Sequence, residues 1–227
     1  MKFLKWLLLS LGVVVVVAVA IGLFSRTTSS LHTKDTVKIA VDAYIYGYPL
    51  VTFDMARRQQ TNVEAADAEH APMGQMIKMR EYLAVDNHCC AAPNADTLYT
   101  LAWLDVGDEP WVLNIPDMGE RYFIVPLLDG FSEVFKVVSP GTTGSHAQTY
   151  AITGPGWHGT LPEGVTEVKS DTAMVWVLGR IYSIGTPEDY DEVHALKDQL
   201  IVKPLRYYGK RYTPPNTVVY TSLDVQT

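Results

Sequence analysis

The residues best suited to chemistry lie within one stretch of the sequence, NHCCAAPNADTLYTLAWLD, which runs from Asn87 to Asp105. Its centre, Pro93 to Asp96, is typical of a turn, because Asn and Asp side chains accept hydrogen bonds from nearby backbone amides. A carboxylate such as Asp96 can also serve as a general acid or base when a second titratable group lies within reach. The stretch is therefore a candidate active site, metal site or structural turn.

Metal binding is the least favoured of these interpretations. Cys89 and Cys90 are the only cysteines, and His88 precedes them. Adjacent cysteines rarely pair with each other, because the usual Cα spacing of a disulfide cannot be met. Zinc sites usually draw ligands from two separated pairs, and no second Cys pair or His-x-x-His occurs. We therefore expect no metal and no cofactor, and two small apolar thiols near a turn.

Arg180 and His146 are the candidates outside this stretch. Arg180 lies in the apolar run VWVLGRIY, where a guanidinium needs a carboxylate or several carbonyls because an unpaired buried charge is costly. Its candidate partners are Asp96, Asp105 and Asp129. A structural ion pair is favoured over catalysis. His146 directly follows a serine, which on a strand would point to the opposite face, so a loop histidine is favoured over a catalytic base.

Helical periodicity precedes these candidates in the chain. From Lys34 to Tyr48, apolar residues recur at intervals of three and four, which predicts a helix with one apolar face. Pro49 is expected to kink this helix or to open a second one. The segment from Thr61 to Glu81 lacks clean periodicity and predicts a long loop, which in compact domains is often a binding element.

Beyond Pro93 the sequence predicts short strands separated by Gly, Pro and Asp turns. In the first strand, four alternate residues share one face: Thr97, Tyr99, Leu101 and Trp103. Further strands are expected within residues 111–116, 121–129, 131–139, 148–155, 166–170 and 172–182, and weakly in the tail. A late helix is expected over residues 186–200, with Thr186 as its N-cap. The predicted fold is α+β, with a mainly antiparallel β sandwich or barrel.

The start of the chain predicts membrane attachment. An apolar run from Trp6 to Phe24 follows Lys2 and Lys5 and is about long enough to span a bilayer. A cleaved signal peptide remains an alternative, although the length of the run favours an uncleaved signal anchor. We expect a transmembrane helix or signal over residues 1–28 and a hinge over residues 29–35. The bulk would then lie outside the bacterial inner membrane, periplasmic or extracellular, in a single-pass protein.

The charge distribution argues against nucleic acid as a partner. The whole chain has a formal net charge of −7, and all 25 acidic residues lie beyond the apolar run. A surface of this kind does not attract a phosphate backbone. The expected partners are instead the membrane, a small polar ligand, and a partner domain or a second copy of the chain.

The motif PNADTLY, followed by AWLD, resembles the signature of the bacterial family called domain of unknown function 1254. The resemblance covers residues 36–212 through four further blocks in order, Ala43–Val51, Arg121–Phe135, Gly141–Val168 and Val175–Gln199. Ala92 departs from the Arg or Thr that members often carry. Many members also continue into a second domain, of unknown function 1214, so residues 213–227 are interpreted as a tail or a truncated linker.

The resemblance implies an exported envelope protein of α+β fold without an established reaction. It also implies that the turn, the Tyr-rich helix and the strand of Arg180 are family features. Our hypothesis is that these positions meet in one polar and aromatic pocket. The alternative is that the aromatic residues and turns build the core and its edges. The expected ligand-binding residues are Tyr44, Tyr48, Asn94, Asp96, Tyr99, Arg121, Asp129 and Arg180. A ligand-binding or structural module is the leading hypothesis. The alternative is a hydrolase or lyase acting on a small polar or sugar-like substrate, with Asp96 as acid/base and His146 as a second catalytic candidate.

Overall fold

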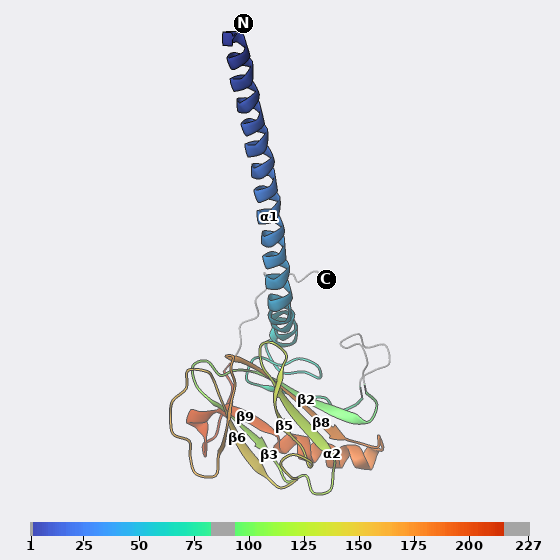
Figure 1. The fold of residues 1–227 in the computed structure, drawn as a ribbon. Helices are drawn as coiled ribbons and strands as arrows, with labels where there is room; N and C mark the ends of the chain where they lie inside the picture. The colour runs from blue at the N-terminus through green and yellow to red at the C-terminus, as the bar shows by residue number, and fades with distance from the viewer. Residues whose placement is uncertain (1, 83–93, 216–227) are drawn as a thin grey trace. The chain divides into compact units, whose positions relative to one another are not determined.

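The computed structural model describes residues 2–82 and 94–215, and for residues 2–18, 20 and 22–32 it describes the backbone alone. The chain divides into two compact units, residues 1–48 and residues 49–227. The first helix, α1 (Lys2–Thr61), contributes to both units (Figure 1). It runs through residues 29–35, where the sequence predicts a hinge, without a break in the helical assignment.

Nothing in the described side chains tests the predicted membrane anchor, because residues 1–28 lie almost wholly outside them. Among the residues that the structure does describe, no helix is both long and apolar enough to cross a bilayer. His88, Cys89 and Cys90, together with the weak strand predicted in the tail beyond residue 215, also lie outside the described residues.

Pro49 does not end α1, so the alternative in which a second helix begins after Pro49 is wrong. A proline removes its own N–H from the hydrogen-bond ladder and crowds the preceding turn. Burial compensates for this loss within the second unit. Phe53 is 5% exposed and packs edge to face on Trp103, with 4.8 Å between the ring centroids. The residues after Pro49 are therefore held in the helix by their packing.

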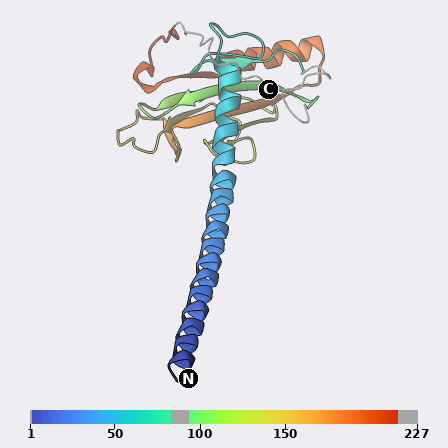
Figure 2. The same ribbon diagram turned by 90° about the horizontal axis from the view of Figure 1, so that it is seen from above.

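The second unit contains two β-sheets, which can be followed in Figures 1 and 2. Sheet A is antiparallel throughout, with the strand order β1 (Met76–Lys78), β2 (Thr97–Asp105), β8 (Met174–Tyr182), β4 (Phe123–Leu128) and β5 (Val134–Val138). Sheet B has the strand order β7 (Thr166–Lys169), β6 (Gln148–Thr153), β3 (Trp111–Ile115) and β9 (Ile201–Pro204). In sheet B only β6 and β7 are parallel.

One buried core joins the two sheets. Ala102, Val125 and Val177 of sheet A belong to the same fully buried cluster as Leu113 and Ile152 of sheet B. Side chains alternate between the two faces of a strand, so each sheet buries one face in this core. The α+β prediction is confirmed. The barrel alternative is wrong, because the outermost strands of both sheets remain unpaired in the described residues.

The late helix α2 (Pro187–Gln199) begins where the sequence predicts it. The hydroxyl of Thr186 accepts a hydrogen bond from the amide of Asp189, as an N-cap should. Val193 places the apolar face of α2 in the common core. Two short strands, β1 and β9, and the 3₁₀ helix η1 (Leu205–Tyr207) were not predicted, because three or four residues carry no readable periodicity.

The second face of sheet A positions the site described below. Tyr99, Leu101 and Trp103 of β2 share this face, as predicted. The end of α1 covers Trp103 through Phe53, and the segment 71–79 covers Leu101. This cover is incomplete, and a cavity remains beneath it.

Candidate functional site

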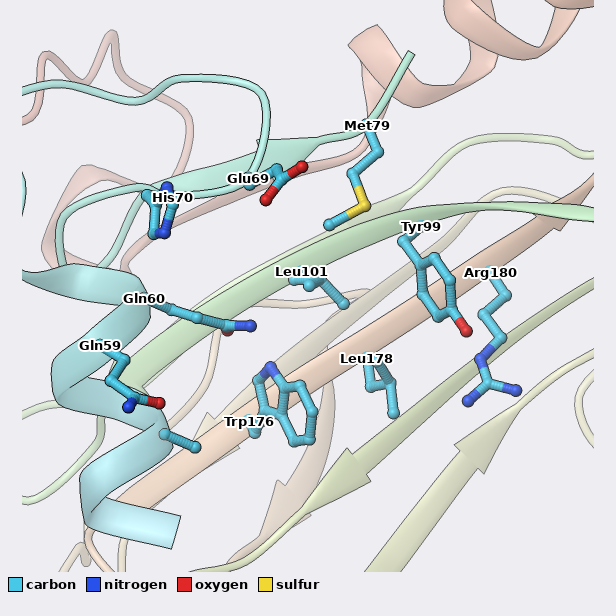
Figure 3. A pocket seen from close by; sticks show the side chains of 11 residues that line it. Gln59, Gln60, Glu69, His70, Met79, Tyr99, Leu101, Trp176, Leu178 and Arg180 are labelled. Carbon is cyan, nitrogen blue, oxygen red and sulfur yellow. The ribbon is translucent and has the colours of Figure 1, made fainter. Parts of the chain in front are cut away.

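A cavity of about 410 Å³ lies on the second face of sheet A, within the second unit of the chain (Figure 3). Sites for small molecules commonly have volumes of this order. Three parts of the chain line it: the end of α1, the segment between α1 and β2, and the strands β2 and β8. The lining residues are Ala56, Gln59, Gln60, Glu69, His70, Met79, Tyr99, Leu101, Trp176, Leu178 and Arg180.

The floor of the cavity follows two alternate cross-strand pairs of β2 and β8, Tyr99 with Arg180 and Leu101 with Leu178, and ends at Trp176, whose cross-strand partner is Trp103. Residues two apart on a strand point to the same face, so all three pairs present their side chains on one side of the sheet. Arg180 lies four residues along the strand from Trp176, which is about 13 Å of backbone. The floor is cationic at one end, aliphatic in the middle and aromatic at the other end (Figure 3).

Arg180 has no carboxylate partner among the described residues. Its guanidinium carbon lies 5.2 Å from the ring centroid of Tyr99, a cation–π contact. Its Nε is buried and lacks a hydrogen-bond partner in the described part of the chain. The predicted ion pair with Asp96, Asp105 or Asp129 is therefore not found there.

The positions of the three aspartates explain this result. Antiparallel pairing of β2 and β8 puts Asp105 opposite Met174, six residues along the strand from Arg180. Asp96 lies exposed in the turn before β2. Asp129 accepts hydrogen bonds from the amides of Phe131 and Glu133 and thereby holds the turn between β4 and β5. The strand register, which the sequence does not specify, separates Arg180 from all three.

Trp176 supplies a second buried donor to the cavity. Its indole ring stacks on that of Trp103, with 4.9 Å between the centroids and 7° between the planes. The Nε1 of Trp103 donates to Gln60 Oε1 at 2.7 Å, whereas the Nε1 of Trp176 has no acceptor in the described residues. Two residues that line one cavity, Trp176 and Arg180, thus each bury an N–H group without an acceptor.

Two polar residues at the cavity, Glu69 and His70, are positioned by Asp67. One carboxylate oxygen of Asp67 accepts hydrogen bonds from the backbone amides of Glu69 and His70, with N···O distances of 2.8 and 2.7 Å. The same oxygen lies 3.3 Å from Nδ1 of His70. The hydrogen bond from the Glu69 amide is the main cause that lowers the pKa of Asp67 below its ordinary value. An ionised Asp67 therefore fixes the loop that carries both residues.

The Met79 side of the cavity is tied to α2. The amide of Met79 donates to the carbonyl of Tyr99, and its own carbonyl accepts a hydrogen bond from the buried ammonium group of Lys197. The next residue, Arg80, pairs with Asp198 at 2.5 Å, and its carbonyl lies 2.6 Å from His194 Nε2. These contacts hold Met79 at the edge of the cavity.

Two of the predicted ligand-binding residues, Tyr99 and Arg180, meet at this cavity. Tyr44 and Tyr48 lie in the first unit, where their ring centroids are 5.6 Å apart and both side chains are exposed. His146 lines a separate polar hollow of about 360 Å³ beside β6.

The remaining predicted residues do not line the cavity. Asn94 and Asp96 form the turn before β2, and Asp129 holds the turn after β4. Arg121 donates to Asp189 and Glu192, both at 2.7 Å, so its guanidinium is engaged by carboxylates of α2. Nothing in the described residues brings Asp96 next to His146, Asp129 or Arg180. In the same residues, no group of three or more His, Cys, Asp or Glu side chains could hold a metal ion.

Trp176, Leu178 and Met79 line the cavity and were not predicted as site residues. A signal for the first two exists in the sequence, because they alternate with Arg180 in one predicted strand and so share its face. For Met79, the sequence indicated only that the residue lies in a long loop that is a candidate binding element.

The turn before β2 is structural in the described residues, and this leads to a prediction. Asn94 Oδ1 accepts hydrogen bonds from the amide and the hydroxyl of Thr97, at 2.9 and 2.7 Å. Asn94→Ala should lower the free energy of unfolding by about 1–2 kcal/mol, because both donors lose their acceptor. Urea denaturation measures the change. Asn94→Asp keeps an acceptor oxygen, so its free energy of unfolding should fall by less. Equal losses of stability in the two variants would contradict the role of Asn94 as a hydrogen-bond acceptor in this turn.

Comparison with known proteins identifies the family. A family described as a protein of unknown function (DUF1254) matches residues 73–204, more than half of the chain. The chain belongs to this family. The DUF1254 match includes both sheets, α2 and the whole floor of the cavity, while the cover contributed by residues 56–70 precedes it.

A solved structure supports the fold. The crystal structure of the VPA0106 protein from Vibrio parahaemolyticus is similar to this chain with a TM-score of 0.59 and 29% identity. The alignment covers 79% of this chain and 41% of the Vibrio chain, so this chain spans less than half of that protein's length.

Other comparisons add nothing to this assignment. A putative uncharacterised protein from Burkholderia cenocepacia aligns at 11% identity over 58% of this chain and 34% of its own. Its TM-score of 0.36 is too low to be evidence of a shared fold. A comparison with curated proteins found no match.

Proposed function

We propose that this DUF1254 protein is a small-molecule binding module, whose ligand occupies the cavity on the second face of sheet A. The supporting observation is the pair of buried N–H donors, on Trp176 and Arg180, that line the cavity without acceptors in the described residues. The large majority of buried side-chain polar atoms in native structures have a hydrogen-bond partner, and a bound ligand would provide it here.

The cellular setting is part of the same proposal. Residues 1–28 would anchor the chain in the inner membrane of a bacterium, and the binding unit would lie in the periplasm or outside the cell. The apolar run after two lysines supports this. A partner domain or a second copy of the chain is part of the proposal as a partner, and the chain spans 41% of the length of the Vibrio protein.

The place of Asp96 argues against the alternative in which this residue is the catalytic acid/base. A hydrolase or lyase that uses Asp96 as acid/base needs this carboxylate at a cavity together with a second titratable group. Asp96 lines neither of the two hollows described above, and its only hydrogen bonds in the described residues are made by its backbone.

The test is to fill the cavity. Leu178→Trp places an indole ring on the middle of the floor, whereas Val134→Trp places the same ring on an exposed position of β5. The full-length chain in lipid nanodiscs would be screened by thermal shift against organic acids, sugars and lipid headgroups. A ligand at a hundred times its Kd should stabilise wild type by about 2.7 kcal/mol.

The control variant Val134→Trp should respond to the ligand as wild type does, and Leu178→Trp should not respond. An unchanged ligand response in Leu178→Trp would place binding elsewhere. A screen in which no compound stabilises the wild type would remove the proposal.

A further inference from the structure

We infer that the ligand of this cavity is an amphipathic carboxylate, whose acid group binds Arg180 and whose apolar body lies along the floor toward Trp176. The inference rests on the proposed function and names the class of ligand. It follows from the order of chemical groups along the floor.

The cationic end selects an anion. Arg180 lies under the cavity with a buried Nε that lacks an acceptor, and no described carboxylate pairs with it. A guanidinium offers two parallel N–H donors whose geometry matches a carboxylate, and charge-assisted hydrogen bonds of this kind are among the strongest in proteins. A cationic ligand would meet Arg180 directly, and a neutral ligand would leave its charge uncompensated.

The one acidic residue of the lining does not oppose this assignment. Glu69 extends from the loop after α1, beside His70, at the opposite side of the cavity from Arg180 (Figure 3). Asp67 fixes the backbone at this point. The acid group of the ligand would bind at Arg180, on the other side of the cavity from this residue.

The middle of the floor selects an apolar body. Leu101 and Leu178 form the cross-strand pair next to Tyr99 and Arg180, and the Met79 side chain lies beside them (Figure 3). Removing an apolar chain from water onto these side chains is favourable in proportion to the area buried. A short acid such as acetate has no body to bury there.

The far end sets the length and adds a second contact. Trp176 lies about 13 Å of backbone from Arg180, and its Nε1 donor lacks an acceptor in the described residues. An oxygen at the distal end of the ligand would accept from this donor. The structure therefore assigns medium-chain acids to the cavity, with a preference for those that carry a terminal hydroxyl or carbonyl oxygen.

The experiment compares decanoate, 10-hydroxydecanoate, 1-decanol, decylamine and acetate on the full-length chain in lipid nanodiscs. Binding would be followed by tryptophan fluorescence, since Trp176 lines the cavity, and by calorimetry. Decanoate should bind wild type about tenfold more tightly than decanol, and acetate and decylamine should bind more weakly than either. The hydroxy acid should bind more tightly than decanoate.

Variants separate the contributions of the two ends. Arg180→Met should lower the affinity for decanoate by about 10- to 100-fold and leave that for decanol unchanged, while Arg180→Lys should retain part of the selectivity. Trp176→Phe should remove only the advantage of the hydroxy acid. Circular dichroism would establish that each variant is folded, and the selectivity series on wild type needs no variant.

Two failures have different meanings. If sugars, alcohols or amines bind and are excluded by Leu178→Trp, but carboxylates do not bind, the cavity is a binding site and the assignment of the ligand class is overturned. Equal affinity of Arg180→Met and wild type for decanoate would also overturn it. If no compound of any class binds, the proposed function fails together with the inference.

Discussion

Lys197→Met is expected to flatten the pH dependence of the stability of this protein. Burial, followed by repulsion from Arg80 and Lys78, lowers the pKa of Lys197 from 10.5 to about 7, against the attraction of Asp198. Below pH 7, Lys197 is protonated in both the folded and the unfolded state. In this range its buried charge lowers the free energy of unfolding by more than at any higher pH. Between pH 7 and 10.5 the unfolded state binds more protons, so stability rises with pH.

The magnitude follows from the shift. From pH 6 to pH 9, wild type should gain about 2–3 kcal/mol from this one residue, and Lys197→Met should gain none of it. The methionine leaves the Met79 carbonyl without its donor, which lowers stability by about 1–3 kcal/mol at every pH. The free energy of unfolding of the variant should therefore be closest to that of wild type at pH 6 and furthest below it at pH 9.

Urea denaturation at pH 6, 7.5 and 9 measures this difference. The matched control is Lys169→Met, because Lys169 is exposed on the edge strand β7 and its replacement should leave the pH profile of wild type unchanged. Parallel profiles for Lys197→Met and wild type would show that Lys197 does not titrate in this range. His194 and Arg80 also meet at this end of α2, so the profile of each variant is compared with wild type rather than interpreted alone.

Part of the site was predictable because alternation along a strand is local information. The pattern of residues 97–106 places Tyr99 and Leu101 on one face, and that face does line the cavity. The long loop after Thr61, predicted as a binding element, contributes Glu69 and His70 to the same lining. Each of these assignments can be made from the types of residues that are close together in the sequence.

The partners of Arg180 were not predictable in the same way. They depend on the register between β2 and β8, two strands that are about seventy residues apart in the chain, and a shift of one residue would reverse every face. The rule that a guanidinium in an apolar strand needs a carboxylate is general. For Arg180 this rule predicts an aspartate of the same chain as the partner. In the described residues Arg180 instead faces a cavity.

The largest loss of stability at neutral pH is expected for Arg121→Met. Arg121 and Asp189 keep only 16% and 12% of their side chains exposed and lie 2.7 Å apart, and Arg121 also donates to the carbonyl of Tyr182. Removing one partner of an ion pair that is mostly shielded from water leaves the other uncompensated. We expect a loss of about 3 kcal/mol, which is at the lower end for buried pairs and above the value for exposed pairs.

The pH dependence of this loss distinguishes an ion pair from simple packing. Burial raises the pKa of Asp189, but hydrogen bonds from Ser183, Arg121 and the Ile184 amide outweigh it and hold that pKa below 3.8. The stabilisation is therefore complete above pH 3.8 and is lost as the pH falls through the lowered pKa, so Arg121→Met and wild type should converge in acid. Arg206→Met removes an arginine whose pair with Glu109 is largely exposed, and it should cost less than about 1 kcal/mol. Equal losses in the two variants, or a difference from wild type that persists in acid, would mean that Arg121 stabilises α2 by packing alone.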